Sequence, residues 1–486
     1  MKERPYRIAL LALGHGVFIA LLALAWKHAL LRSTFGDTAY QVFQWISQPG
    51  WDIEAHRYTA IVPQACVKFM ALFGPGLRTL LVTASLAHVL VGWAVYAACA
   101  HVWRAPVSAF ACALAAVLCS RLAFYSPVLE ANYLLCYPFL LLGYLESRSG
   151  ARVEGCEGAR VQHSNSPTLQ LLHPCTFVLA LLLLLIPLIV HPAGWLVMLL
   201  CIVMAFALGW TDRRATVVLA LSAQCWPLVS RWLFPPTGYE LELYGGVLDG
   251  LRALGHMSAW GSVNFLYIHT FTASITYLPA LLVLVAVVIS WAVLRERRLA
   301  ALTLAGAAAF TLVYLITFHA GDAAVMQDRG ILPVATPIAF SASALVMRAA
   351  TPRTRLVALV LAVLVLVVKI RDVSFASRPF AEQYRSTEAL ITAARAQGVE
   401  RGIVDAAVLR ERGVEAGWAF PVEILLRSAV QGPEHGLILI SGDNSPPTDA
   451  LATGQLLILG LPWDVDANGS GYFRRSAGPY VQFVPQ

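Results

Sequence analysis

The feature of this sequence that most limits its possible folds is a series of apolar stretches, each close to 20 residues long. A helix of about 20 residues crosses the hydrocarbon core of a bilayer, so a chain that repeats such stretches is typical of a polytopic membrane protein. Between the seventh and eighth stretches, Pro235–His269 is expected to form a long outer loop. The predicted transmembrane helices number eleven and are approximately Ile8–Trp26, Thr79–Val102, Pro106–Phe124, Val128–Glu146, Cys175–Val190, Ala193–Trp210, Ala215–Phe234, Phe271–Leu294, Leu299–Phe318, Ile331–Met347 and Leu356–Ile370.

The composition supports this interpretation. Hydrophobic residues make up 58% of the 486 residues, and charged residues make up only 13%. A soluble domain carries about 25% charged residues, nearly twice that fraction. The nine cysteines show no CxxC spacing and none follows Cys225, so they are typical of buried small side chains and not of a disulfide framework or a zinc site. We therefore expect an all-α polytopic membrane protein.

The positive residues predict the orientation of the chain. The net charge of +7 is dispersed over short loops, which favours membrane topology over a nucleic-acid partner. Lys2, Arg4 and Arg7 precede the first stretch, and a dense group at Arg295–Arg298 follows the eighth. Because Lys and Arg favour the cytoplasmic side, the N-terminus is expected in the cytoplasm, and eleven spans place the C-terminus outside it. The prediction is a multi-pass protein of the bacterial inner or plasma membrane type.

The chain is expected to form two domains. Residues 1–370 form the transmembrane domain, which includes a long first outer loop at residues 27–78. Residues 371–486 contain helix-like runs at Phe380–Gln397 and Phe420–Val430, which alternate with short apolar runs. This order favours a small α/β extracytoplasmic domain; an irregular cap on the membrane part is the alternative. The expected strands are Gly402–Asp405, Leu437–Ile440 and Leu456–Leu459.

The first outer loop holds the clearest candidate for chemistry. Asp37 comes directly after the first predicted span and is flanked by aromatic residues, Phe35 and Tyr40. A carboxylate in this place can act as a general base toward an acceptor hydroxyl, or can help to hold a divalent cation. The alternative is an ordinary loop aspartate near the start of the next helix.

Four more polar residues follow in the same loop. Asp52, Glu54 and His56 alternate along the chain, so an extended segment would place them on one side. Arg57 could bind a phosphate through two parallel hydrogen bonds. We take Asp37, Asp52 and Glu54 as catalytic candidates and His56 and Arg57 as substrate-binding candidates. A solvated loop with surface ion pairs is the alternative.

Other substrate-binding candidates lie at the predicted outer ends of later spans. They are Glu130, His191, Asp328 and Arg329, and they are expected to line one outer cavity with the first-loop residues. Glu130 could instead pair with Arg121, and His191 could be a polar residue of a turn. Asp328 and Arg329 form a structural ion pair in one interpretation, and in the other Arg329 binds the phosphate of a lipid.

The whole arrangement resembles the GT-C-type membrane glycosyltransferases. The shared features are an inward N-terminus, a long first outer loop with an aspartate after the first span, about a dozen spans and an outer C-terminal domain. Phe35-Gly36-Asp37 matches the position of their catalytic first-loop acidic residue, and Asp52 or Glu54 could stand for a second one. Many members have an adjacent acidic pair, whereas this sequence has Asp52-Ile53-Glu54. The resemblance implies a polyprenyl-phosphate-linked sugar as donor, and it makes a divalent cation a candidate cofactor.

The expected function is transfer of a sugar from a polyprenyl-phosphate donor to a lipid, glycan or protein acceptor at the outer face. A transporter or flippase of lipid-linked glycans is the main alternative, and it would place charges in mid-span and often contain paired broken helices. Most charges lie at the outer ends of the spans, which favours the enzyme. Pro187 and Pro227 interrupt two spans, so the flippase remains an alternative. A third reading is a non-catalytic subunit that anchors partners through its C-terminal part.

Overall fold

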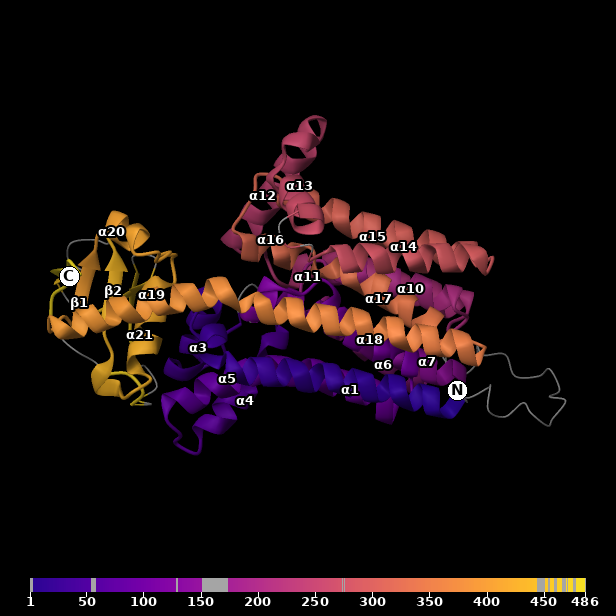
Figure 1. Ribbon diagram of the computed structural model, residues 1–486, viewed down its shortest axis with the longest axis horizontal. Helices are drawn as coiled ribbons and strands as arrows, with labels where there is room; N and C mark the ends of the chain where they lie inside the picture. The colour runs from indigo at the N-terminus through magenta and orange to yellow at the C-terminus, as the bar shows by residue number, and fades with distance from the viewer. Residues whose placement is uncertain are drawn as a thin grey trace.

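A computed structural model of the protein describes residues 3–53, 58–127, 130–150, 174–272, 274, 276–443, 451–452, 455–458, 461–465, 469, 471–474 and 478–485. The fold is mostly helical, with a small region of sheet near the C-terminus (Figure 1). This confirms the prediction of a helical protein with a small sheet-containing region. The count of eleven spans and the likeness to GT-C enzymes stay predictions.

The helices of the bundle run along its length (Figure 1). Each of the predicted apolar stretches contains at least one of them. The bundle helices are α1 (Glu3–Lys27), α5 (Leu77–Ala97), α6 (Pro106–Leu118), α7 (Pro138–Gly150), α9 (Pro174–Leu188), α10 (Gly194–Ala207), α11 (Arg213–Leu233), α14 (Leu278–Val293), α15 (Arg297–Thr317), α17 (Ala335–Met347) and α18 (Pro352–Phe375).

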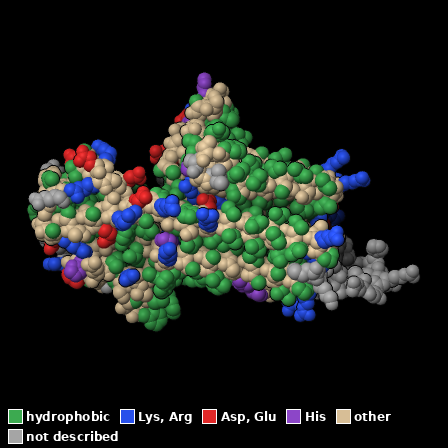
Figure 2. Space-filling model, in the orientation of Figure 1, with side chains coloured by type: hydrophobic (Ala, Val, Ile, Leu, Met, Phe, Trp, Pro, Cys, Tyr) green, Lys and Arg blue, Asp and Glu red, His purple; other side chains and the backbone are tan. Residues whose placement is uncertain are grey.

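Four helical segments of the described chain are long and apolar enough to cross a membrane, and this supports the predicted membrane association. Their side chains leave a broad hydrophobic surface along the bundle (Figure 2). The orientation of the bundle in the membrane stays a prediction. The four segments are Arg4–Lys27, Leu77–Val102, Arg297–Thr317 and Ala324–Met347.

Short helices occupy the end of the bundle that carries the sheet, here called the sheet end. Within the predicted first loop they are α2 (Ala29–Ser33), α3 (Gly36–Ser47), the 3-10 turn η2 (Tyr58–Ala60) and α4 (Ile61–Ala71). Later in the chain they are η4 (Leu122–Tyr125), η5 (Glu130–Leu135), α16 (Ala324–Gly330) and η8 (Leu332–Val334).

Two predicted spans are interrupted at the sheet end. The third ends as an α-helix at Leu118 and continues as η4, and the fourth begins as η5 before α7. The backbone N–H of Ala123 donates to the Asp328 carboxylate, at 2.8 Å, in place of a helical carbonyl. A side chain that captures a backbone donor in this way ends the regular helical ladder.

The segment predicted as a long outer loop, Pro235–His269, is helical for most of its length, while its position outside the membrane stays a prediction. It forms α12 (Gly238–Arg252), η6 (Leu254–Ala259), α13 (Gly261–Tyr267) and the start of the π-helix η7 (Ile268–Thr272). A reciprocal capping box starts α12: the Thr237 hydroxyl accepts from the Glu240 N–H, and the Glu240 carboxylate accepts from the Thr237 N–H at 2.8 Å. In Figure 1, α12 and α13 project from the side of the bundle.

The C-terminal sheet is parallel with strand order β2-β1-β5, where β1 is Arg401–Val404, β2 is Ile438–Ser441 and β5 is Val481–Gln482. A parallel pair needs a long crossover, and α20 (Ala406–Glu411), α21 (Phe420–Ala429) and η9 (Pro433–His435) lie between β1 and β2. A separate antiparallel pair consists of β3 (Leu456–Ile458) and β4 (Leu461–Trp463). The three predicted strands correspond to β1, β2 and β3.

The sheet is seated on the first-loop helices. Helices α18 and α19 (Ser377–Ala396) carry the chain from the bundle to the sheet (Figure 1). Helix α21 packs between β2 and α3, where Phe43 of α3, Val422 and Leu425 of α21 and Ile440 of β2 belong to one buried apolar cluster. Burial of this shared apolar surface, the main driving force of folding, therefore joins the two ends of the sequence.

The packing of α12 against α15 depends on one glycine. A Cβ atom at Gly250 would lie 2.3 Å from the backbone oxygen of Ile316, whereas a Cβ at Gly245 in the same helix would meet nothing within 4 Å. This oxygen belongs to the last turn of α15 and cannot move away without a shift of the backbone, so a methyl group added at Gly250 would overpack the contact.

We expect Gly250→Ala to lower the free energy of unfolding by about 1–3 kcal/mol, because the methyl group overpacks the α12–α15 contact. Gly245→Ala serves as the matched control and should leave stability unchanged or raise it by about 0.4–1 kcal/mol. Thermal unfolding of both purified full-length variants in the same detergent provides the measurement. Equal unfolding midpoints would contradict the close packing of α12 on α15.

Candidate functional site

Asp37 lies in the first turn of α3, and its carboxylate pairs with an arginine from a distant segment. The Arg329 guanidinium donates from Nη1 to Asp37 Oδ2 at 2.9 Å. The Arg329 side chain is 7% exposed, whereas that of Asp37 is 33% exposed, so the pair is buried on the arginine side and open on the aspartate side. The structure therefore brings together two residues that sequence analysis selected for different roles.

The other side of the Arg329 guanidinium is held by a third segment. Its Nη2 donates to the Ser126 hydroxyl at 2.6 Å, just after η4. Asp37, Ser126 and Arg329 thus come from the predicted first loop, the turn after the third span and the segment before the tenth span. The structure thus places Asp37 and Arg329 in contact, while one outer cavity lined by all the candidate residues stays a prediction.

Asp328 does not pair with its neighbour Arg329. Its two carboxylate oxygens accept from the backbone N–H of Ala123 and from the Tyr277 hydroxyl. Asp328 is fully buried, and these contacts fix α16 against η4 and the start of α14. Arg329 therefore pairs with Asp37 and not with Asp328. Asp328 instead joins the segments that contain Ala123 and Tyr277.

Two residues that sequence analysis missed bind the chain just before Asp37. The Glu423 carboxylate of α21 accepts from the backbone N–H of Gly36 at 2.8 Å. The Arg427 guanidinium donates to the Thr34 hydroxyl and to the Thr34 carbonyl, each at 3.0 Å, and lies 3.7 Å from Glu423. Their signal was available: Glu423 and Arg427 are the only charges in the apolar run Phe420–Val430, at the four-residue spacing of helical pairs.

The electrostatics of this pair follow from its burial. Burial raises the pKa of the Glu423 carboxyl, an effect that the Arg427 charge and the Gly36 N–H oppose and that the Asp37 charge reinforces. Burial likewise lowers the pKa of Arg427, opposed by the charge of Glu423. The carboxylate that accepts from the residue before Asp37 is therefore that of Glu423, which is 387 residues from Gly36 in sequence.

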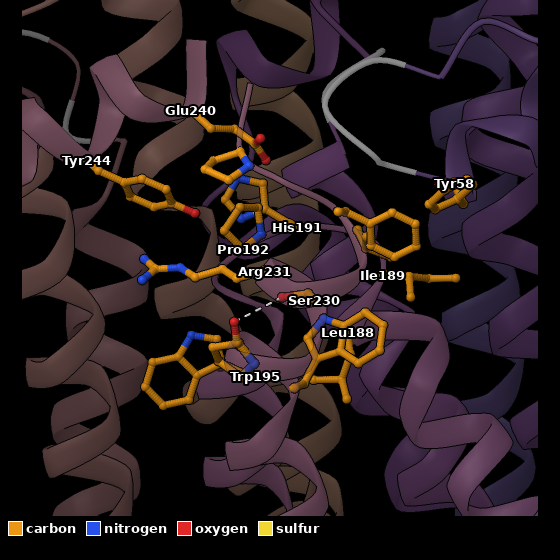
Figure 3. A pocket seen from close by; sticks show the side chains of 15 residues that line it. Tyr58, Leu188, Ile189, His191, Pro192, Trp195, Ser230, Arg231, Glu240 and Tyr244 are labelled. Atoms are coloured by element: carbon orange, nitrogen blue, oxygen red, sulfur yellow. Dashed lines mark hydrogen bonds between the residues drawn. The ribbon is translucent and has the colours of Figure 1, made fainter. Parts of the chain in front are cut away.

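His191 lines a cavity of about 180 Å³ between the α9–α10 turn, the end of α11 and the start of α12 (Figure 3). Arg231 and Tyr244 lie on one side of this cavity and Tyr58 on the other, and the Arg231 guanidinium is 5.1 Å from the Tyr244 ring centre. The lining combines aromatic rings with a few polar groups, which is typical of pockets for small polar ligands. The lining residues are Tyr58, Leu188, Ile189, Val190, His191, Pro192, Trp195, Trp226, Pro227, Ser230, Arg231, Phe234, Pro236, Glu240 and Tyr244.

The remaining candidates are placed as follows. Asp52 contacts α4, where its backbone N–H and carbonyl bond the side chain of Gln64 at 3.1 and 3.2 Å. Glu54, His56 and Arg57 lie outside the described residues. The side chain of Glu130 does so too, while Arg121 bonds the ring of His269 at 3.0 Å.

Among the residues that the structure describes, no group of three or more His, Cys, Asp or Glu side chains could hold a metal ion. Comparisons with protein-family models, with curated proteins and with solved structures found no match to this chain.

We expect Arg427→Met to detach the sheet from the first-loop helices, because it leaves Glu423 buried without its charge partner and removes both bonds to Thr34. Loss of one member of a buried pair costs about 3–5 kcal/mol. The measurement is denaturant-induced unfolding of the full chain, with protease sensitivity of the region after α18 as a second readout.

Arg410→Met is the matched control, since Arg410 and Asp443 form an ion pair at 3.6 Å with both side chains about 70% exposed. An exposed pair contributes about 0–1 kcal/mol, so this variant should behave as wild type. Equal stability of the two variants would contradict a specific anchoring role for Arg427.

Proposed function

We propose that the protein is an integral-membrane glycosyltransferase that moves a sugar from a polyprenyl-phosphate-linked donor to a lipid, glycan or protein acceptor. The observation that carries this proposal is the Asp37–Arg329 pair at the sheet end, with Asp37 partly open to solvent. The pair supplies the two groups that the reaction needs: a carboxylate that can take a proton and a cation that can bind a leaving phosphate.

The charge distribution supports an outward-facing sheet end. Arg213, Arg297, Arg348 and Arg353 lie at the ends of bundle helices away from the sheet. In Figure 2, Lys and Arg side chains are visible at that end with few acidic side chains beside them, whereas at the sheet end they are mixed with Asp and Glu. Positive residues favour the cytoplasmic side. In the proposed orientation Asp37 and Arg329 therefore lie at the extracytoplasmic face, at the depth of lipid headgroups.

The proposed reaction is a single displacement at the anomeric carbon. The acceptor hydroxyl oxygen attacks this carbon, its proton passes to the Asp37 carboxylate, and the bond between the carbon and the phosphate oxygen breaks. Polyprenyl phosphate leaves with the electron pair and is bound by Arg329. Because one guanidinium contacts both Asp37 and Ser126, an arriving phosphate would compete with Asp37 for Arg329 and release the carboxylate to act as a base.

A flippase of lipid-linked glycans is the second candidate, and a specific observation favours it. Pro187 lies inside α9 and Pro227 lies inside the neighbouring α11, and Pro227 also lines the His191 cavity. A proline inside a helix removes one backbone hydrogen bond and often kinks the helix. Paired interrupted helices beside a cavity are a feature of transporters.

We expect Asp37→Asn to lower the rate of sugar transfer by about 10²–10⁴-fold, because the amide keeps the size of the side chain but cannot accept the proton. The assay uses full-length protein in membranes that contain native acceptors, with a panel of polyprenyl phosphates that carry a radiolabelled hexose or pentose. Transfer is measured as label that appears on the acceptor.

Asp249→Asn is the control, because Asp249 forms an exposed ion pair with Arg252 at 3.0 Å in α12. Unchanged transfer by Asp37→Asn at normal protein abundance would remove Asp37 from the mechanism. Movement of a fluorescent lipid-linked sugar between leaflets of proteoliposomes, without cleavage of its phosphate bond, would favour the flippase instead.

The orientation has its own test. A phosphatase reporter that is active only outside the cytoplasm should be active when fused after Gln486. It should be inactive when inserted between the fourth and fifth predicted spans, within Ser147–His173, because eleven predicted spans place these two sites on opposite faces. The reverse result would place Asp37 and Arg329 at the cytoplasmic face, where the proposed reaction would need a different donor side.

A further inference from the structure

A second cavity of about 660 Å³ lies between α1, α5 and α19, away from the His191 cavity. Its volume falls within the range of ligand pockets, about 300–1,000 Å³. Lys27, His28 and Arg78 supply its basic side chains, and Tyr384 of α19 closes one side. No acidic side chain is among the described residues that line it.

The two cations of this cavity lie at the ends of two apolar segments. Lys27 is the last residue of the apolar segment Arg4–Lys27, and Arg78 is the second residue of the segment Leu77–Val102. Both side chains belong to exposed residues, and neither makes a hydrogen bond or an ion pair with another described residue. Lys and Arg at such positions reach the level of the lipid headgroups.

Much of the cavity lining is apolar. Leu31, Val82 and Leu86 are among the lining residues, and so is Trp26, which has 66% of its surface exposed. Tryptophan is enriched where a bilayer meets water. A ligand that fits this lining has an anionic head and an apolar chain. Exposed cations at helix ends are common. The feature that suggests a ligand here is a cavity of about 660 Å³ that is lined by both cations and by apolar side chains.

From this geometry we infer that the cavity binds the phosphate headgroup of an anionic membrane lipid, with Lys27 and Arg78 on the phosphate and the chain along α1 and α5. The inference does not rest on the proposed sugar transfer and holds for either candidate function. A free phosphate ion could bind the same two cations, but it has no apolar chain to contact the apolar side chains of the cavity.

The cavity is connected to the Asp37 site through one aromatic ring. The Arg427 guanidinium lies 4.7 Å from the centre of the Tyr384 ring, and Arg427 binds Thr34 two residues before Gly36. A lipid that packs against Tyr384 would therefore stabilise the contact between α19, α21 and the first-loop helices. Bound lipid should raise the stability of the whole sheet end.

The experiment measures the unfolding temperature of purified full-length protein in detergent during titration with dioleoyl phosphatidic acid. A ligand that binds only the folded state raises this temperature in a concentration-dependent way. We expect Lys27→Gln/Arg78→Gln to weaken the apparent affinity by about 10–30-fold, because each cation near a membrane phosphate contributes a severalfold factor. Arg353→Gln, an exposed cation at the opposite end of the bundle, is the matched control and should keep the wild-type affinity.

Two further titrations identify the source of the phosphate. Dioleoyl phosphatidylcholine has the same chains and no net charge, and it should give no more than a small shift. Inorganic phosphate alone should give none; an equal shift from it would overturn the lipid assignment in favour of a free-ion site. An undiminished response of the double variant would overturn the role of Lys27 and Arg78. If the double variant is unstable without lipid, Lys27→Arg/Arg78→Lys must restore the phosphatidic acid response, and its failure to do so counts against the site.

Discussion

The contact on which the candidate site depends is the one between α21 and the chain just before α3. Arg427 binds the hydroxyl and the carbonyl of Thr34, and Glu423 accepts from the N–H of Gly36, so the C-terminal helix holds two of the three residues that precede Asp37. Gly36 has a φ of +51°, a backbone conformation that glycine adopts readily. The N–H that Glu423 binds is therefore presented by a residue that no other type would easily replace.

Buried charges of this kind specify position more than they add stability. A buried ion pair loses the hydration of both ions, and an apolar pair of similar size is often as stable. Apolar packing of α21 on α3 supplies the affinity of the sheet for the bundle. The bond that Glu423 accepts from the Gly36 N–H and the bonds that Arg427 donates to Thr34 fix where α21 lies against the start of α3. A carboxylate that must meet a substrate within a fraction of an ångström benefits from such fixing, since loops alone position side chains loosely.

Much of the fold could be predicted because its signals are local. Apolar stretches, the changed character after Arg371 and the short strands near Gly402, Leu437 and Leu456 are all visible within windows of a few residues. The segment after Pro235 was missed because its glycines and turn residues have low helix propensity. Its helicity comes from the Thr237–Glu240 capping box and from packing on α15, and the second of these is a tertiary effect.

Two members of the candidate site could be predicted from the sequence, but its other members and the pairing of its side chains could not. Asp37 and Arg329 were selected because charged residues are scarce and both flank predicted spans, which is local information. That Arg329 would choose Asp37 over its neighbour Asp328 depends on where the Asp328 carboxylate is already used, by Ala123 and Tyr277. Glu423 was not selected because its partner, the N–H of Gly36, is distant in the sequence, and only the fold shows that the two are in contact.

The short helix α2 determines what kind of influence a ligand beside it can have on Asp37. One side of α2 is fixed, because the fully buried Arg32 donates to the carbonyls of Phe124 and Ser85 at 2.8 and 3.1 Å. The other side lines the cavity between α1, α5 and α19. The bonds of Arg32 favour the arrangement of α2 seen in the structure, and a ligand shifts an equilibrium between arrangements only by its differential affinity for them. An occupant of that cavity that contacts α2 would therefore add contacts to the arrangement that already holds Asp37.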